Sequence, residues 1–227
     1  MNHSIIIQSL KDLASKRPFF WSEADFQFAF SEVLRIHLPN AKIRLERPFP
    51  ISDEKYYHVD IWVEDDGKVY PIELKYKTKK CSVTVEDEII QVTEQSAIDL
   101  GRYDYVADIK RIEDIRDKDP LFGEGYAIIL TNDASYYTDP EETINTMDSE
   151  FRIHEGAKLS GELRWRCTSK AKKVDENGNR DSRKAITLSD SYTMNWNLYS
   201  IVQNKNGITI PLQSCVTIIK NNRYIVI

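Results

Sequence analysis

The chain has 227 residues, a length typical of one domain, and its hydrophobic fraction of 41% excludes an intrinsically disordered protein. Its net charge of −5 argues weakly against a nucleic-acid binder, although positive charge can be concentrated locally. Three cysteines lie far apart, so neither a disulfide framework nor a zinc ribbon is expected. No signal-peptide pattern or long apolar run is found, so we expect a reduced, cytoplasmic protein without a membrane partner.

The first predicted element is a helix that begins after Ser22. Asp25 follows three places later, a short form of a capping box, and apolar residues then recur at helical spacing as far as Leu38. Apolar and charged residues alternate over residues 42–49 and predict a strand. We expect Pro48 and Pro50 to end it, because proline cannot donate a ladder hydrogen bond.

A β-hairpin is predicted over residues 58–76. Asp66-Gly67 is a favoured pair for a two-residue type I′ turn, and apolar and polar residues alternate on both sides of it. The apolar residues of both strands are expected to share one face, which packs on the core. They are Val59, Ile61, Val63, Ile72, Leu74 and Tyr76.

The elements after the hairpin have less regular patterns. A helix is expected from about residue 86 to 116, with a break near Gly101-Arg102, and Asp108-Ile109-Lys110 within it is interpreted as structural. A turn is expected at 175–179, inside a basic segment at 164–184. Further strands are expected over 126–130, 186–188, 207–212, 216–219 and 224–227. The whole pattern predicts one mixed α/β or α+β domain over residues 1–227.

Three charged residues of the hairpin form a candidate site: Asp60, Glu73 and Lys75. The two-residue turn places Asp60 directly opposite Glu73, with Lys75 two residues further along the same face. Facing carboxylates repel each other unless a cation lies between them, and Mg²⁺ prefers oxygen ligands. The pattern therefore predicts a divalent-metal site in which Lys75 helps an attacking water. The alternative is a solvated sheet face whose acids pair with Lys75 and Lys77.

The run HVDIWVEDDGKVYPIELKYK, residues 58–77, resembles the core of the PD-(D/E)XK nuclease superfamily. The resemblance implies a central mixed β-sheet flanked by helices, with a restriction-endonuclease-like core over 20–130 and a β-rich C-terminal extension over 131–227. It implies that Asp60 and Glu73 bind Mg²⁺, with Mn²⁺ as an alternative ion, and that Lys75 assists the water. Val59 stands where the family has a proline, which is a minor departure.

Further site residues follow from the same resemblance. Many members carry an additional metal-binding Glu on a helix before the hairpin, and Glu23 matches it by position. Glu46 and Glu32 are weaker alternatives, and attraction to the positive end of the helix dipole would equally explain Glu23. Gln27 lies one turn after Glu23 on the same helix face, so it is a candidate contact to the substrate.

Candidate substrate contacts also follow the hairpin. Some members of the superfamily use a Gln on the next helix to approach nucleic acid, and Gln95 is preferred to Gln91 for this role. Lys77 is a candidate phosphate contact, because Lys and Arg supply most sequence-independent affinity for nucleic acid. The basic segment at 164–184, with aromatic residues such as Trp165, is another candidate surface. Solvent exposure of the charges and burial of the tryptophan are the alternative explanations.

The expected function is a Mg²⁺-dependent nuclease that hydrolyses phosphodiester bonds, with DNA preferred to RNA as the partner. Two alternatives stay open: a non-cleaving nucleic-acid-binding module of the same fold, and a protein-interaction domain. A homodimer also stays open, since many enzymes of this fold need a dimer to cut both strands of a duplex.

Overall fold

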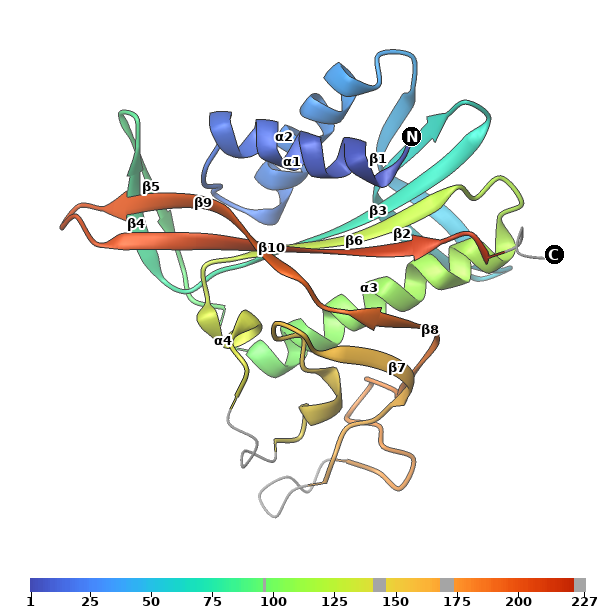
Figure 1. The fold of residues 1–227 in the computed structure, drawn as a ribbon. Helices are drawn as coiled ribbons and strands as arrows, with labels where there is room; N and C mark the ends of the chain where they lie inside the picture. Colours follow the sequence, from blue (N-terminus) through green and yellow to red (C-terminus); the bar gives the residue numbers. More distant parts are fainter. Residues whose placement is uncertain (96, 141–145, 168–173, 223–227) are drawn as a thin grey trace.

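The computed structural model describes residues 1–95, 97–140, 146–167 and 174–222 (Figure 1). Its helices are α1 (His3–Lys16), α2 (Glu23–His37), α3 (Ile98–Lys118), α4 (Ala134–Tyr137) and the 3₁₀ helix η1 (Ser149–Phe151). Its strands are β1 (Lys42–Ser52), β2 (Lys55–Asp65), β3 (Lys68–Lys77), β4 (Cys81–Val85), β5 (Glu88–Val92), β6 (Glu124–Thr131), β7 (Lys158–Leu163), β8 (Ile186–Thr193), β9 (Trp196–Asn204) and β10 (Thr209–Lys220). The chain is therefore a mixed α+β fold, as predicted.

Eight of these strands form one mixed sheet in the order β1-β2-β3-β6-β10-β9-β4-β5, and β7 pairs with β8 in a separate two-stranded sheet. β1, β2 and β3 are successive antiparallel neighbours, whereas β6 runs parallel to β3. A parallel pair needs a long crossover connection, and here it contains the β4–β5 hairpin and α3. β3 therefore lies inside the sheet, between β2 and β6.

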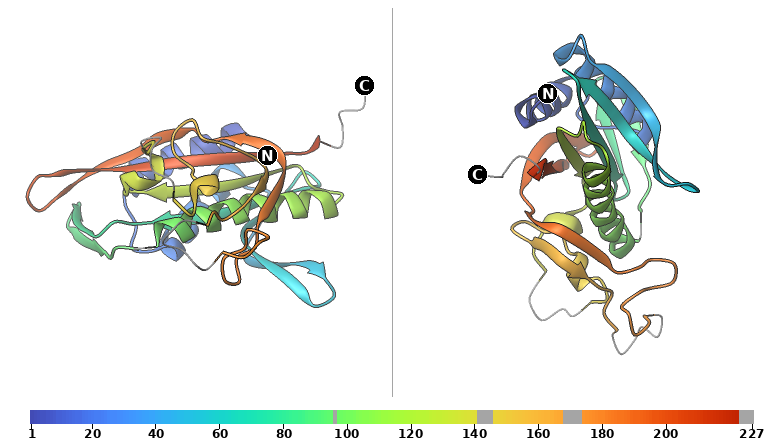
Figure 2. Two further views of the ribbon diagram at one scale, coloured as in Figure 1. Left: turned by 90° about the horizontal axis from the view of Figure 1, so that it is seen from below. Right: turned by 90° about the vertical axis from the view of Figure 1, so that its right-hand side faces the viewer.

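Helices cover both faces of the large sheet. α1 and α2 lie on one face, and α3 lies on the other with the β7–β8 sheet beyond it (Figures 1 and 2). An apolar core forms on each side, with Phe26 and Leu74 in the α1/α2 core and Ile109 and Ile129 in the α3 core. In the described ranges, no helix has both the length and the apolar character needed to cross a membrane. The two cores fix β3 between α2 and α3.

Three local predictions around the site are confirmed. Ser22 is the N-cap of α2, and its hydroxyl accepts a hydrogen bond from the Asp25 N–H at 3.2 Å. Asp66 and Gly67 have φ angles of 47° and 70°, the positive values that a type I′ turn requires. The β2–β3 register near this turn is also as predicted.

The first strand is longer than predicted. β1 continues through Pro48 and Pro50 to Ser52, so the expectation that these prolines end the strand was wrong. β1 lies at the edge of the sheet and has only β2 beside it. An edge strand tolerates proline where the missing N–H would point to solvent.

The sequence pattern suggested one broken helix over residues 86–116, and this prediction was wrong. β4 and β5 form a hairpin around Glu86-Asp87, and α3 begins only at Ile98 and passes through Gly101 without a break. The prediction failed because β4 is also paired with β9, more than a hundred residues later. Such a long-range pairing overrides local helix preference.

Gly101 lies in α3 where a side chain would meet Tyr136. A Cβ at this position would lie 2.2 Å from the Tyr136 hydroxyl oxygen. Gly101→Ala is therefore expected to destabilise the protein by about 1–3 kcal/mol through overpacking, against a gain of roughly 1 kcal/mol in helix propensity. Urea unfolding measures the net loss, and adding Tyr136→Phe, which removes the hydroxyl, should recover most of it. A stabilising Gly101→Ala would contradict this close approach.

The later strands agree with the sequence pattern in part. Residues 209–212 and 216–219 belong to one strand, β10, whereas 207 and 208, also predicted as strand, precede it. Residues 186–188 begin β8. Asp175 forms the predicted turn by accepting hydrogen bonds from the N–H groups of Asn177 and Asn179, each at 2.9 Å. The strand predicted over 224–227 lies outside the described residues. β10 lies between β6 and β9, so this part of the chain completes the main sheet.

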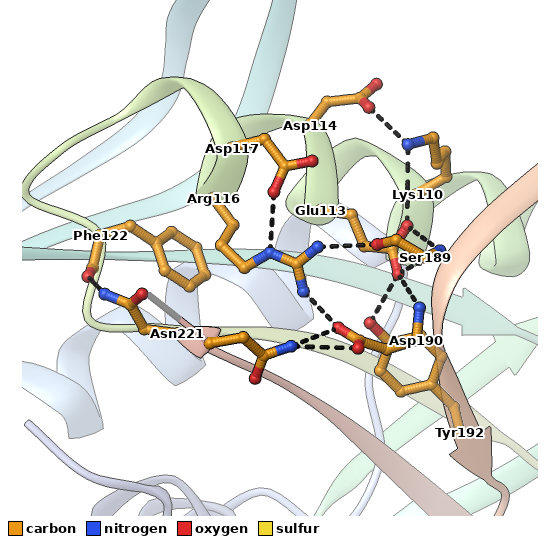
Figure 3. Close-up of polar contacts among 11 residues, drawn as sticks. Lys110, Glu113, Asp114, Arg116, Asp117, Phe122, Ser189, Asp190, Tyr192 and Asn221 are labelled. Atoms are coloured by element: carbon orange, nitrogen blue, oxygen red, sulfur yellow. Dashed lines mark hydrogen bonds and ion pairs between the residues drawn. The ribbon is translucent and has the colours of Figure 1, made fainter. Parts of the chain in front are cut away.

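A buried carboxylate on α3 forms hydrogen bonds with β8 (Figure 3). Glu113 is fully buried and accepts hydrogen bonds from the N–H groups of Ser189 and Asp190, at 3.0 and 3.1 Å, and from the Tyr192 hydroxyl at 2.9 Å. Arg116, one turn later on α3, pairs with the Asp190 carboxylate. These contacts fix the part of α3 that directly follows Asp108 and Arg111, the residues that contact β3.

Candidate functional site

β2 and β3 separate at Asp60. The ladder between the two strands ends at the Ile61–Ile72 pair, one step before Asp60 and Glu73 would meet. Oδ2 of Asp60 instead accepts a hydrogen bond from the Leu74 N–H at 2.5 Å. The expectation that Asp60 lies directly opposite Glu73 in the ladder is therefore corrected, because the Asp60 carboxylate takes the place of a strand partner for β3.

Glu23 binds the next N–H along the same edge of β3. It is the first residue of α2, and its Oε2 accepts a hydrogen bond from the Tyr76 N–H at 2.7 Å. Leu74 and Tyr76 are two residues apart in the strand, so their N–H groups point to the same side. Glu23 and Asp60 thus come from different elements and meet at the edge that β2 leaves open. Metal binding by Glu23 stays a prediction.

Glu73 and Lys75 both face α3, so they lie on the same face of β3, as predicted. Nζ of Lys75 lies 2.9 Å from Oδ2 of Asp108 and donates a hydrogen bond to the Leu74 carbonyl oxygen at 3.0 Å. Nη1 of Arg111 lies 3.1 Å from Oε2 of Glu73 and 3.6 Å from Oδ1 of Asp108. Asp108 therefore joins Lys75 and Arg111 into one network of ion pairs that includes Glu73.

The apolar residues of the hairpin do not share one face throughout. Most of them pack in the α1/α2 core, including Ile61 and Leu74, but Val59 packs in the α3 core. The single apolar face was therefore wrongly predicted at Val59. The regular alternation of the strand is interrupted where β2 leaves β3 at Asp60.

Burial sets the electrostatics of the site. It raises the pKa of Asp60 to about 6, although a backbone N–H and the Lys75 ammonium oppose this change. Burial and the nearby Asp108 carboxylate raise the pKa of Glu73 well above its ordinary value, although the Arg111 guanidinium that pairs with it opposes this change. Burial lowers the pKa of Lys75, but the carboxylates of Asp108 and Glu23 outweigh it, so that the pKa is raised. Lys75 is therefore a cation at neutral pH.

The raised pKa of Asp60 predicts that this carboxyl contributes more to the stability of the metal-free protein as the pH falls from about 7 to about 5. The native carboxyl takes up its proton near pH 6, whereas the unfolded chain does so near 3.8. This stabilisation is fully present below the pKa of the unfolded state and is lost as the pH rises through the pKa of the native state. It amounts to at most about 3 kcal/mol. Urea unfolding at both pH values should show a weaker pH dependence for Asp60→Asn. An equal dependence in both proteins would contradict the prediction.

The carboxylates suit a hydrated Mg²⁺ ion better than a fully protein-bound one. Within the part of the chain that the structure describes, no three His, Cys, Asp or Glu side chains are grouped to hold a metal ion. Mg²⁺, however, usually keeps several waters and is bound through one or two carboxylates. Oε1 of Glu73 is buried and has no hydrogen-bond partner among the described residues. Asp60 and Glu73 therefore fit the ion by their chemistry and by this unsatisfied oxygen.

Gln27 borders the site from α2. Its Nε2 donates hydrogen bonds to the Asp60 carbonyl oxygen and to Oε1 of Glu46, each at 2.7 Å. Gln27 thus fixes the backbone where β2 turns away from β3, and its contact with a substrate stays a prediction. Glu46, the alternative to Glu23, accepts this bond from Gln27, and Glu32 lines a separate groove between α2 and β1.

Lys77 and Gln95 line one pocket next to the site. The pocket has a volume of about 350 Å³ and is also lined by Arg183. Lys77 follows Lys75 on the same side of β3, so the pocket extends the row of site residues. Gln95 lies in the loop before α3 and Gln91 lies in β5, so the expectation of a helix at both positions was wrong.

The described part of the basic segment is largely paired with acids. The pairs are Arg164–Glu162, Arg166–Glu150 and Arg180–Asp99. Trp165 is buried, which agrees with the alternative explanation that it is a core residue. Lys170, Lys172 and Lys173 lie outside the described residues. These pairs reduce the positive charge that the described part offers to a nucleic acid.

Asp108 and Arg111 are site residues that the sequence pattern did not reveal. Asp108 was interpreted as structural, yet it is buried and bound to Lys75. A signal was present, because Asp108 shares the buried stripe of α3 with Tyr105 and Ile112 at helical spacing. A charged residue on such a stripe requires a partner of opposite charge.

Comparisons with known proteins give no match. No family model, no curated protein and no solved structure matches the chain significantly. The geometry and charge of the site described above are therefore the basis for inferring a function.

Proposed function

We propose that the chain is a metal-dependent nuclease of the PD-(D/E)XK type with a restriction-endonuclease-like core. The observation that carries this proposal is the convergence of Asp60, Glu73, Lys75 and Glu23 where β2 and β3 separate. Burying several acids and an ammonium together is costly, and perturbed ionisable groups of this kind are typical of functional sites.

The order of the elements around the site also supports the proposal. α2 precedes the antiparallel strands β1, β2 and β3, and α3 leads to β6, which is parallel to β3. This arrangement fits the mixed sheet flanked by helices that the sequence resemblance implies. The Asp and the Glu-x-Lys then lie on neighbouring strands, as the family pattern requires.

Each residue has a defined role in the proposed reaction. Asp60 and Glu73 would hold Mg²⁺ or Mn²⁺, and Glu23 would add a direct or water-mediated contact. The ion would supply an activated water and offset charge on the phosphate. Lys75 would orient that water and stabilise negative charge in the transition state. Its raised pKa favours this cationic role over that of a base.

The proposed substrate is nucleic acid, with DNA preferred to RNA, in the cytoplasm. The pocket that Lys77, Gln95 and Arg183 line lies next to Lys75 and would receive the chain beyond the scissile phosphate. Gln27 is the corresponding candidate contact on α2. A homodimer would bring two such sites to the two strands of a duplex.

A non-cleaving nucleic-acid-binding module of the same fold is the second candidate. Arg111 favours it, because this guanidinium already pairs with Glu73, one of the two proposed ligands. The net charge of −5 and the acid-paired arginines of the basic segment favour a protein-interaction domain instead.

A cleavage assay on single- and double-stranded DNA and RNA tests the proposal. Cleavage is expected with Mg²⁺ or Mn²⁺ and not with a chelator. Asp60→Ala should remove it, whereas Asp53→Ala, which removes an exposed carboxylate from the β1–β2 turn, should not. Binding without cleavage under every metal tested would favour the second candidate. Neither binding nor cleavage would favour a protein-interaction domain.

A further inference from the structure

Glu73 is buried against a guanidinium from the protein itself. The residue is 1% exposed, and its Oε2 lies 3.1 Å from Nη1 of Arg111. Its other oxygen has no hydrogen-bond partner among the described residues. A buried carboxylate needs a compensating cation. Arg111 thus supplies at Glu73 the positive charge that a metal ion would bring.

Arg111 lies at the rim of the site, where it can give up this contact. Its side chain is 30% exposed, compared with 14% for Lys75. Its Nη1 also lies 3.6 Å from Oδ1 of Asp108, and its guanidinium carbon lies 5.2 Å from the centre of the Tyr57 ring. These two partners can hold Arg111 after it leaves Glu73. Lys75 cannot replace it as easily, because Lys75 is less exposed and already bound to Asp108.

We infer that Arg111 is a counter-ion that pairs with Glu73 in the metal-free protein and is displaced when a divalent ion binds there. The inference rests on the proposed metal site. A guanidinium stays charged at every pH in use, so an entering ion meets its positive charge next to the ligand. Arg111 therefore weakens metal binding and keeps the acids neutralised in its absence.

Mn²⁺ binding, measured by titration calorimetry without nucleic acid, tests the displacement. Arg111→Gln should bind Mn²⁺ roughly tenfold more tightly than the parent, because a charge this close changes an ionic equilibrium by one or more powers of ten. Lys118→Gln is the matched control, since it removes the same charge from an exposed position on α3 and should leave the affinity unchanged. Arg111→Met serves the same comparison if Arg111→Gln is poorly folded.

A second experiment tests the Arg111–Glu73 ion pair without metal. In a chelator, Arg111→Gln should lower the urea midpoint, and adding Glu73→Gln should restore much of it, because the buried charge is then removed. No recovery in the double variant would overturn the counter-ion role of Arg111.

The outcomes separate the inference from the proposed function. Mn²⁺ binding that Arg111→Gln leaves equal or weakens would overturn the displacement and leave the metal site intact. No Mn²⁺ binding by any of the proteins would overturn the metal site and the displacement with it, while the chelator arm still reports on the ion pair.

Discussion

Lys75→Met is expected to reduce metal-dependent cleavage by roughly 10²- to 10³-fold, the loss that follows removal of one preorganised donor at a developing charge. Lys75 is the only member of the proposed catalytic set that carries positive charge, and its Nζ is fixed by Asp108 at 2.9 Å and by a backbone carbonyl at 3.0 Å. Methionine keeps much of the length and apolar character of the side chain. The variant therefore removes the ammonium with little change in packing.

The Lys75 experiment has a matched control on the same strand. Lys68→Met removes an exposed ammonium from the start of β3, beside the hairpin turn, and should leave the cleavage rate within about twofold, since exposed substitutions change little. Initial rates should be compared at a temperature where circular dichroism shows both variants folded. Equal rates for Lys75→Met and the parent would exclude the proposed role of Lys75.

The hairpin and the helix before it could be predicted because local chemistry determines both. The Asp66-Gly67 pair specifies a turn with two positive φ angles, and Ser22 caps the helix that presents Glu23. These two features identify the helix that carries Glu23 and the hairpin that carries Asp60, Glu73 and Lys75. The residues that would matter most for the proposed function were therefore visible before their geometry was known.

The separation of β2 from β3 could not be predicted from the sequence. Alternation describes a regular ladder, and a regular ladder places Asp60 opposite Glu73. In the structure, Gln27 binds the Asp60 carbonyl oxygen and the Asp60 carboxylate binds the Leu74 N–H. Each bond joins Asp60 to a distant or non-adjacent part of the chain, so no short pattern reports it.

The partners of Lys75 and Glu73 were missed for a related reason. Asp108 and Arg111 lie on α3, which reaches the site only because α3 packs across β3. The preceding segment was predicted to be helical, and that error displaced the start of α3. The position of α3 also depends on Glu113 and β8, a contact across more than seventy residues.

Asp108→Asn is expected to lower the free energy of unfolding by about 3–5 kcal/mol, the cost of leaving one partner of a buried ion pair without the other. Asp108 is 1% exposed, and the Lys75 side chain with which it pairs is 14% exposed. The substitution would leave the Lys75 ammonium partly desolvated without its carboxylate and would also remove the charge of the 3.6 Å contact with Arg111. Urea unfolding in a chelator measures the loss without a contribution from bound metal.

Two further variants decide whether the ion pair causes the loss predicted for Asp108→Asn. Lys75→Met/Asp108→Asn removes both charges and should recover a large part of the stability, because no buried charge is then unpaired. Asp117→Asn breaks an ion pair on the same helix, but Asp117 is 57% exposed, so a loss of at most about 1 kcal/mol is expected. If the double variant were as unstable as Asp108→Asn, the loss would come from helix packing and not from the ammonium. Asp108 would then no longer be the residue that positions Lys75, and the proposed reaction would need another group to fix its cation.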